Sequence, residues 1–366
     1  PWGEEMAGRR SFLTGFGGVA FCAGCGMLPA RAQGQTSRRK AQVGGKPVRT
    51  VDIHCHCVVP EMLDVLSGTA LEKPAKATIA SATNNPSMKD RLAVMDAQGI
   101  DVEAMSINAF WYGADRDTSR RLMDLLNVRL AAMCREAPDR FVGFGCVSLQ
   151  FPELAAEQLE AAMKQHGLKG AAIGCSVNDR EISDPMFDPF WKKAEELQAL
   201  IFMHPQSAEI ATGIERRVQG NGMLRNVIGN PLETTIALSH MIFEGTFDKF
   251  PGLKICAAHG GGYLASYADR SDNGCETLKQ CTGPYPKKAP TAYLKDIFVD
   301  SLVFTPEALR HLAAVVGPRQ IMVGTDYGFP WVKNPVDHVL DTPGLTDEDK
   351  IAILGGTAAR LLRLDA

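Results

Sequence analysis

From residue 50 onward, short apolar and β-branched runs alternate with longer amphipathic runs. Several of the short runs are apolar on both faces, as strands buried in a parallel sheet must be. The pattern predicts strands at 51–56, 102–108, 141–148, 171–176, 200–205, 253–259, 297–303 and 321–327. It predicts helices at 88–98, 119–136, 152–166, 189–199, 232–247 and 306–316. Thr305 and Pro306 supply the N-cap and the first residue of the last helix.

The eight strands and the helices between them predict an α/β fold, a closed (β/α)8 barrel of the TIM type over residues 50–366. The alternative is an open doubly wound sheet, which normally carries a glycine-rich phosphate loop after its first strand. Here the first strand ends in His54-Cys55-His56, which favours the barrel. The connections at 57–87 and 206–230 are long, and we expect them to be lids or specificity loops at the active-site face.

The N-terminal residues differ in character from the rest of the chain. Arg9-Arg10-Ser11-Phe12-Leu13, an apolar run at 14–28 and Ala30-Arg31-Ala32 predict a twin-arginine signal peptide at 1–32. A chance basic pair before a buried helix is the alternative. Residues 33–49 are polar and basic and predict a flexible linker. Export would place the protein in the periplasm, either soluble or anchored to lipid.

Composition and charge exclude some classes of function. The 366 residues are 45% hydrophobic and 22% charged, and a net charge of -3 provides no polycationic surface for nucleic acid. Beyond the leader, no stretch reaches the ~18 apolar residues that a membrane span needs. The expected partner is therefore a small molecule. Cys275 and Cys281 lie in a polar loop and could pair in an oxidising compartment, although their spacing does not decide this.

Histidines and one aspartate mark the carboxyl ends of the predicted strands. His54 and His56 are two residues apart on the first strand, so both imidazoles point to the same side. His204 ends the fifth strand and Asp326 the eighth. Three neutral imidazoles and one carboxylate suit Zn²⁺, with Mn²⁺ as the alternative, and leave a position for water or substrate. His259 ends the sixth strand and is the candidate catalytic residue, together with Asp326.

Any one of these five side chains could be a polar residue where a strand meets solvent, but in a barrel all five meet at one mouth. At the remaining strand ends, Asn108, Ser148 and Asp300 could support the site or contact substrate. The loops near the mouth supply further candidates for substrate binding, namely Trp111, Gln206 and Arg225.

Five stretches of the sequence carry a family resemblance, at 95–102, 259–262, 298–301, 324–330 and 353–360. Over essentially the whole chain after the leader, the protein resembles the amidohydrolase-related, metal-dependent carboxy-lyases. The resemblance implies zinc on the four residues named above and a catalytic role for His259. It also implies a homodimer, because Arg270 falls where a decarboxylase of this family places an arginine that reaches into the neighbouring subunit to hold a substrate carboxylate.

Departures from the family pattern concern the substrate. Residues 57–87 contain Lys73 and Lys76 but no arginine, whereas the family's decarboxylase binds substrate with an arginine in this loop. Lysine does not reproduce bidentate recognition of a carboxylate. Gln206 stands where the family has a tryptophan. The resemblance therefore implies the metal chemistry and leaves the substrate open.

The expected function is decarboxylation of an aromatic or unsaturated carboxylic acid. The ion would lower the pKa of its bound water to ~7, and His259 would take or shuttle the proton, so that protonation next to the carboxylate lets CO2 leave. A hydrolase of an ester, lactone or amide would use the same residues. A cationic group in the pocket would favour decarboxylation, and an apolar pocket without one would favour hydrolysis. A non-catalytic binding protein would be supported by a lost ligand, yet all five residues are present.

Overall fold

The structure of the protein is a computed structural model, which describes residues 38–81, 86–206, 215–279 and 281–364. The predicted signal peptide, 1–32, lies outside the described residues. Neighbouring strands of the main sheets are parallel throughout. These strands are β3 (Val51–His56), β4 (Val102–Ser106), β5 (Phe141–Gly143), β6 (Gly145–Cys146), β7 (Gly170–Gly174), β10 (Leu200–His204), β11 (Lys254–Ala257), β12 (Phe298–Asp300) and β13 (Ile321–Met322).

The parallel strands close into a ring. They are ordered β3-β4-β5 in one sheet and β6-β7-β10-β11-β12-β13 in the other. β5 and β6 are two parts of one barrel strand, interrupted at Phe144, whose N–H donates to Met105 O of β4 at 2.9 Å, while β6 pairs with β7. At the other junction, Ile53 N–H donates to Val323 O at 2.8 Å, which joins the end of the last strand to β3. The predicted strands therefore form a closed parallel barrel.

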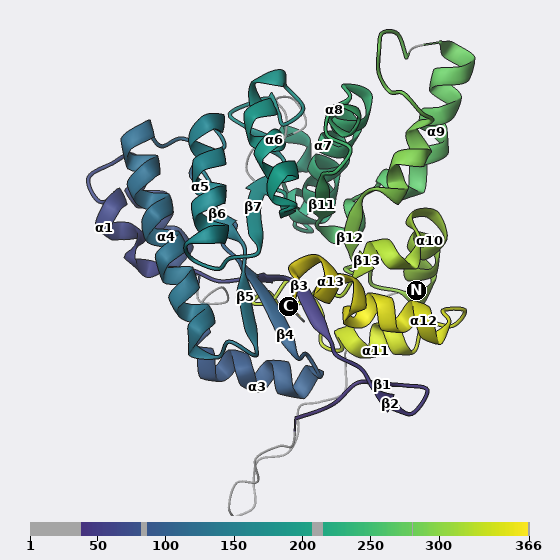
Figure 1. Cartoon of the computed structure of the whole chain (residues 1–366), viewed down its shortest axis with the longest axis horizontal. Coiled ribbons are helices and arrows are strands. Elements are labelled where there is room, and N and C mark those ends of the chain that lie inside the picture. The colour runs from purple at the N-terminus through teal and green to yellow at the C-terminus, as the bar shows by residue number, and fades with distance from the viewer. Residues whose placement is uncertain (1–37, 82–85, 207–214, 280, 365–366) are drawn as a thin grey trace, which may run out of the picture. The chain divides into compact units, whose positions relative to one another are not determined.

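Helices cover the outside of the strands, as Figure 1 shows. The longer helices are α3 (Met88–Gln98), α4 (Arg116–Glu136), α5 (Pro152–Lys164), α6 (Asp188–Leu197), α7 (Asn230–Phe243), α9 (Leu264–Leu278) and α10 (Pro306–Val316). The shorter ones are α1 (Leu63–Leu66), α2 (Glu72–Ala80), α8 (Thr246–Lys249), α11 (Pro335–Leu340), α12 (Asp347–Ile351) and α13 (Thr357–Leu362). Six of the longer helices correspond to predicted ones, and α9 is additional.

Side-chain caps explain where several helices begin. Ser87 Oγ accepts the N–H of Asp90 at the start of α3, at 3.1 Å. Thr305 Oγ1 accepts the N–H of Ala308 at the start of α10, at 3.2 Å, as predicted from its position before Pro306. Each cap satisfies an N–H that the first turn of a helix leaves without an intrahelical partner.

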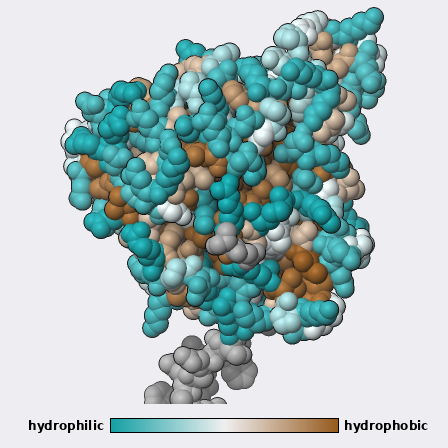
Figure 2. Space-filling view, in the orientation of Figure 1, coloured by the Kyte–Doolittle hydropathy of each residue, from teal (hydrophilic) through white to brown (hydrophobic). Residues whose placement is uncertain are grey.

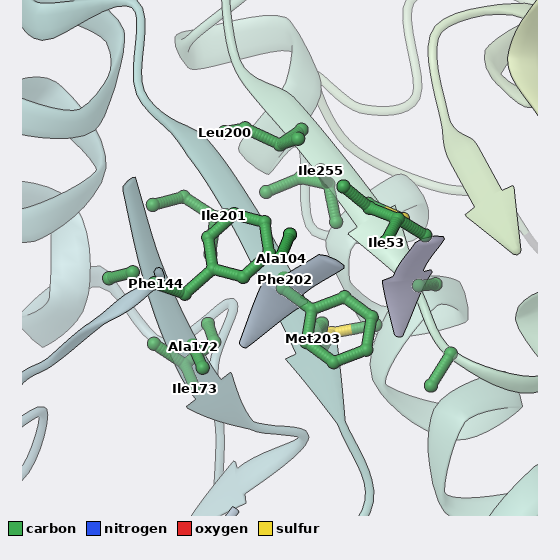
Figure 3. Packing of buried hydrophobic residues seen from close by; sticks show 14 of the residues in the cluster. Ile53, Ala104, Phe144, Ala172, Ile173, Leu200, Ile201, Phe202, Met203 and Ile255 are labelled. Atoms are coloured by element: carbon green, nitrogen blue, oxygen red, sulfur yellow. The ribbon is translucent and has the colours of Figure 1, made fainter. Parts of the chain in front are cut away.

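The core of the barrel is built from alternate residues of its strands. Phe144 and Phe202 stack inside it with ring centroids 5.7 Å apart. Met203 follows Phe202 on β10 and therefore points to the opposite face of the strand, and Figure 3 labels both among the buried residues. These side chains are fully buried. The apolar packing ends where the histidines begin, so the core forms a rigid floor beneath the mouth.

The predicted flexible linker at 33–49 is wrong for the residues that the structure describes. β1 (Gln42–Val43) and β2 (Lys46–Pro47) form an antiparallel hairpin there. Lys40 Nζ donates to Asp101 Oδ1 at 2.8 Å, and Arg38 also pairs with Asp101. The basic residues of this segment thus find an acidic partner just before β4, and composition alone does not indicate that contact.

The outer surface in the view of Figure 2 is mainly hydrophilic, with small apolar areas between polar ones. Within the described ranges, no helix combines the length and apolar character that crossing a bilayer requires.

Candidate metal centre and active site

Four side chains from separate parts of the chain meet at the mouth of the barrel. His54 and His56 lie on β3, His204 ends β10, and Asp326 follows β13. One ligand atom from each residue can be chosen so that all four lie within 4.8 Å of one another, and all four residues are buried. The structure therefore brings together the four residues that the sequence predicts as metal ligands.

The Nδ1 atom of each imidazole has a hydrogen-bond partner that indicates its tautomer. His54 Nδ1 lies 2.6 Å from Asp300 Oδ2. His56 Nδ1 lies 3.0 Å from Ser106 Oγ, whose own hydroxyl donates to a backbone carbonyl. His204 Nδ1 lies 2.7 Å from the carbonyl of the next residue. Because each partner accepts the Nδ1 proton, each Nε2 is free to present a lone pair to the centre.

Acceptor atoms crowd the centre itself. The Nε2 atoms of His54 and His56 are 3.0 Å apart and lie 3.3 and 2.9 Å from Asp326 Oδ1. Lone pairs at these distances repel one another unless a proton or a cation lies between them. Three neutral imidazoles and one carboxylate form a donor set that a divalent transition metal ion fits.

The pKa values of these groups reflect the same crowding. Burial and the neighbouring His56 and His54 hold the pKa of His204 well below its ordinary value of 6.5. Burial also acts to lower the pKa of His54, but Asp326 and Asp300 outweigh it and raise that pKa to about 10. Asp326 and Asp300 therefore surround the His54 imidazole with negative charge, which favours a cation at this centre.

Asp300 connects the metal centre to the turn that carries His259. Its Oδ2 accepts the Nδ1–H of His54 and the backbone N–H of His259, at 2.6 and 2.8 Å. Its Oδ1 accepts the backbone N–H groups of Gly260 and Leu302, at 2.8 and 2.9 Å. Burial acts to raise the pKa of Asp300, but these hydrogen bonds and the nearby histidines bring it below its ordinary value. The side chain is therefore an ionised carboxylate with four N–H donors.

His259 lies beside the centre and lines a cavity above it. Its Nε2 is 3.9 Å from Asp326 Oδ2, and its Nδ1 has no hydrogen-bond partner among the described residues. The chain turns sharply here, because His259 and the three glycines that follow it all have positive φ. A Cβ on Gly262 would lie 2.2 Å from Pro231 O, so the turn requires glycine at that position.

The cavity above His259 and Asp326 has a volume of about 470 Å³. Most of its wall is apolar or aromatic, Asn226 and Asn230 contribute amides, and no described wall residue is a lysine or an arginine. Besides His259 and Asp326, the wall consists of Asn226, Val227, Asn230, Pro231, Gly262, Tyr263, Leu302, Val303, Phe304, Ala308 and Trp331.

The four residues predicted to bind substrate are all described, and none of them belongs to this wall. Trp111 is buried in the loop after β4, with 8% of its surface exposed. Gln206 Nε2 donates to Ser176 O of β8 (Ser176–Val177) at 2.7 Å, so the Gln206 side chain forms its hydrogen bond outside the cavity. Arg225 is half-buried in the helical turn η5 (Arg225–Gly229), and Arg270 lines a separate cavity beside α9.

Sequence reasoning missed the aromatic residues of the wall. Tyr263, Phe304 and Trp331 each lie within a few residues of the end of a predicted strand. Loops after barrel strands build the active-site face, so an aromatic residue in such a loop was a usable signal. Trp111 has the same kind of position, however, and only the fold shows which of these side chains face the cavity.

Residues 51–364 match the amidohydrolase family, and the chain belongs to that family. It is 30% identical over 319 residues to 2-amino-3-carboxymuconate-6-semialdehyde decarboxylase of Dictyostelium discoideum, covering 86% of this chain and 85% of that protein. It is 28% identical over 293 residues to the gamma-resorcylate decarboxylase of a Polaromonas species, covering 75% of this chain and 87% of that protein. The resemblance inferred from the sequence motifs, which pointed most of all to aminocarboxymuconate semialdehyde decarboxylase, is confirmed.

Two solved structures of similar fold are decarboxylases. The structure of 5-carboxyvanillate decarboxylase from Sphingomonas paucimobilis aligns with a TM-score of 0.77 at 25% identity, covering 86% of this chain and 99% of that one. Dihydroxybenzoic acid decarboxylase from a Polaromonas species, with bound manganese and the inhibitor 2-nitroresorcinol, aligns with a TM-score of 0.74 at 24% identity. It covers 87% of this chain and 98% of that one, and at this identity the likeness is one of fold.

Proposed function

We propose that the protein is a metal-dependent carboxy-lyase that removes CO2 from an aromatic or unsaturated carboxylic acid. The observation that carries this proposal is the convergence of four buried acceptor groups, one of which, Asp326, lines a largely apolar cavity together with His259. The relatives support it, because they are decarboxylases related to this chain over most of its length.

The ion would be held by His54, His56, His204 and Asp326. Zn²⁺ suits this donor set, and Mn²⁺ is the second candidate because a decarboxylase of the same fold contains manganese. When bound, the ion supplies Lewis acidity that draws electron density from the reacting acid. Ser106 and Asp300 hold the ring orientations of His56 and His54 that leave both Nε2 atoms available.

His259 would deliver the proton that decarboxylation needs, and its position beside Asp326 on the cavity wall supports this role. It would donate this proton to the carbon that bears the carboxylate. The bond between that carbon and the carboxylate then breaks, its electron pair restores the unsaturated system, and CO2 leaves. The carboxylate and one proton become a C–H bond and CO2, and His259 regains a proton from water at the open side of the cavity.

Hydrolysis of an ester, lactone or amide is a second candidate. The observation that favours it is the absence of a lysine or arginine from the described wall, because a neutral substrate needs no cationic partner. Decarboxylation remains our proposal, since the ion itself can take the charge of the reacting carboxylate.

We also propose that the protein forms a homodimer through the region of α9. Tyr267 and Leu278 on this helix are 70% and 66% exposed. Arg270 and Tyr267 line a cavity that shares Tyr263 with the active-site cavity. Figure 1 shows α9 extending away from the strands at the upper right. Sedimentation equilibrium tests the proposal, because Tyr267→Arg should shift a dimer towards monomer, whereas exposed Val128→Arg on α4 should not.

Export by the twin-arginine route, with residues 1–32 as the signal, is a further part of the proposal. It is supported by the Cys275–Cys281 disulfide, because disulfides persist in oxidising compartments such as the periplasm. Replacing Arg9 and Arg10 with lysine should keep the protein in the cytoplasmic fraction of the producing cell. Periplasmic recovery of that variant would contradict this route.

Metal content and CO2 release test the proposed function together. The wild type should carry about one zinc or manganese ion per chain, and His54→Ala should lose it. His259→Asn should keep the metal but release CO2 from hydroxybenzoates at least about 100-fold more slowly. His311→Asn, an exposed histidine on α10, is the matched control and should change neither quantity.

Three outcomes would count against these assignments. A wild type without metal after growth in replete medium would contradict the metal centre. Full activity of His259→Asn would contradict the role of His259 as proton donor. Turnover of esters or lactones, with no CO2 from any acid, would replace the carboxy-lyase with the hydrolase.

A further inference from the structure

We propose that Thr235 on α7 is a positioning residue for His259. Its hydroxyl accepts a backbone N–H at the far end of the turn that carries this histidine. The inference rests on the proposed function, because it concerns the proton donor of that reaction. It assigns this donor a support that comes from a helix and not from the metal centre.

The turn after β11 has a backbone that neighbouring groups must hold in place. His259 and the three glycines that follow it have φ between 57° and 75°. This conformation is unfavourable for a residue with a Cβ, such as His259, and it persists only where the surrounding structure fixes it. The direction of the His259 side chain therefore depends on the contacts at both ends of the turn.

Two side chains hold the two ends of this turn. Asp300 accepts two backbone N–H groups at its start, including that of His259, both at 2.8 Å. Thr235 Oγ1 accepts the backbone N–H of Tyr263 at its end, also at 2.8 Å. Between these two contacts, the Gly262 N–H donates to His259 O at 3.0 Å. A displacement at Tyr263 should therefore move His259, because one hydrogen-bonded turn joins them.

The hydrogen bonds of the Thr235 hydroxyl fix its orientation. It donates its proton to Pro231 O, one turn back in α7, at 2.7 Å. Since a hydroxyl has a single proton to give, its oxygen is left to accept the Tyr263 N–H. The turn also packs closely against α7 here, because a Cβ on Gly262 would lie 2.6 Å from Thr235 Oγ1. The helix and the turn are thus fitted together at this hydroxyl.

Thr235 lies outside the described wall of the active-site cavity and lines the separate cavity beside Arg270. It would therefore act through the turn and not by contact with substrate. Asp300 also contacts His54, so a change of that residue would affect metal binding as well. The Thr235 hydroxyl bonds to the turn and to its own helix, so its loss should displace His259 while the metal ligands stay in place.

Replacing Thr235 with Val in the metal-loaded full chain tests the proposal. The side chain keeps its shape, but the Tyr263 N–H loses its acceptor. The kcat for CO2 release from hydroxybenzoates should fall by at least about tenfold, while KM changes by less than about threefold. The metal content should equal that of the wild type.

Two further variants separate positioning from general stability. Thr235→Ser keeps the hydroxyl and should restore most of kcat. Ser239→Ala removes a hydroxyl that donates to Thr235 O within α7, at 2.7 Å, and should leave kcat unchanged. An unchanged kcat in Thr235→Val, or a kcat in Thr235→Ser that is equally low, would overturn the proposal. Loss of metal from Thr235→Val would overturn it as well.

A measurement without turnover separates this proposal from the proposed function. If no hydroxybenzoate releases CO2, the carboxy-lyase is contradicted, and the NMR signal of the His259 imidazole in the zinc-loaded chain decides about Thr235. Its loss in His259→Asn identifies this signal. The signal should move in Thr235→Val and return in Thr235→Ser, while that of His311 stays in place. An unmoved His259 signal in Thr235→Val would refute the positioning role.

Discussion

Asp300 links two groups of the site that come from different strands. Its carboxylate holds His54 in the tautomer that leaves Nε2 free, and it accepts the backbone N–H groups of His259 and Gly260. A residue that orients a ligand contributes to metal affinity without touching the ion, because the ligand would otherwise rotate or change tautomer. The position of the proposed proton donor and that of a metal ligand therefore depend on one side chain.

Replacing Asp300 with Asn should lower metal affinity by about 10- to 100-fold. The amide has nearly the same size but lacks the negative charge, and it can turn an N–H towards His54 Nδ1. Competition with a chromophoric chelator measures the affinity. Asp124→Asn, on the exposed face of α4, is the matched control, and equal affinities of the two variants would contradict the role of Asp300.

At the scale of residues, the sequence predicts a side chain of the site correctly where its position along a strand decides whether it reaches the mouth of the barrel. His54, His56, His204 and Asp326 all stand at strand ends, so a barrel brings them together whatever its loops do. Asp300 was expected to support the site for the same reason. The contact of Ser106 with His56 was not predicted, because it depends on the register between β3 and β4, which no local pattern reveals.

At the scale of elements, Arg91 ties helix α3 to the strands behind the metal centre. Its guanidinium lies 2.7 Å from Glu103 on β4, pairs with His56 O, and lies 4.8 Å from the centre of the Tyr327 ring. Arg91 and Glu103 are 1% exposed. Burial of the two charges is tolerable because each neutralises the other, so the contact is sensitive to loss of one partner.

Arg91→Met should destabilise the fold by about 3–5 kcal/mol, since Glu103 is then buried without its cation. The loss should be smaller at low pH, because a protonated Glu103 needs no cation. Urea unfolding followed by circular dichroism measures the free energy at each pH. Arg120→Met removes one partner of the exposed Arg120–Glu157 pair and should cost less than about 1 kcal/mol. Similar losses of stability in the two variants would contradict the conclusion that burial makes the Arg91–Glu103 pair sensitive to loss of one partner.

The hairpin formed by β1 and β2 is held to the barrel by Asp101. Burial acts to raise the pKa of Asp101, but a hydrogen bond from Lys40, the Thr50 N–H and the charge of Arg38 lower it below 3.8. A carboxyl group with a lowered folded pKa adds stability above its unfolded pKa and loses it as pH falls through the folded value.

Asp101→Asn should therefore destabilise the protein by about 1 kcal/mol at neutral pH. The difference in the free energy of unfolding between this variant and the wild type should shrink as pH falls below about 4. Thermal unfolding across this range measures it, with Asp179→Asn in the exposed turn after β8 as the control. A difference that is constant with pH would show that the charge of Asp101 is not what holds the hairpin.

At the scale of the whole molecule, the candidate ligands come from both ends of the chain and from its middle. β3 follows the N-terminal hairpin, β10 lies in the middle of the barrel order, and Asp326 follows β13. An ion bound by all of them joins the first and last strands at the point where the barrel closes. Binding to the folded chain alone stabilises the fold by mass action.

Removing the metal should lower the melting temperature. A free ion concentration of 100 times its Kd should add about 2.7 kcal/mol to the free energy of unfolding. Calorimetry with and without a chelator measures the shift. His54→Ala should abolish the metal-dependent part of it, and a shift that persists in this variant would place the stabilising ion elsewhere.

The order of strands and helices and the residues at the strand ends can be predicted from the amino-acid sequence, because both follow from periodicities that are local in the chain. Tertiary structure decided the Nδ1 partners of the histidines, the aromatic and uncharged wall above them, and the ordering of the hairpin on Asp101. It also placed Trp111, Gln206, Arg225 and Arg270 outside that wall. These features arise where loops from distant parts of the chain meet, so they depend on strand register and loop conformation together, which no short stretch of sequence specifies.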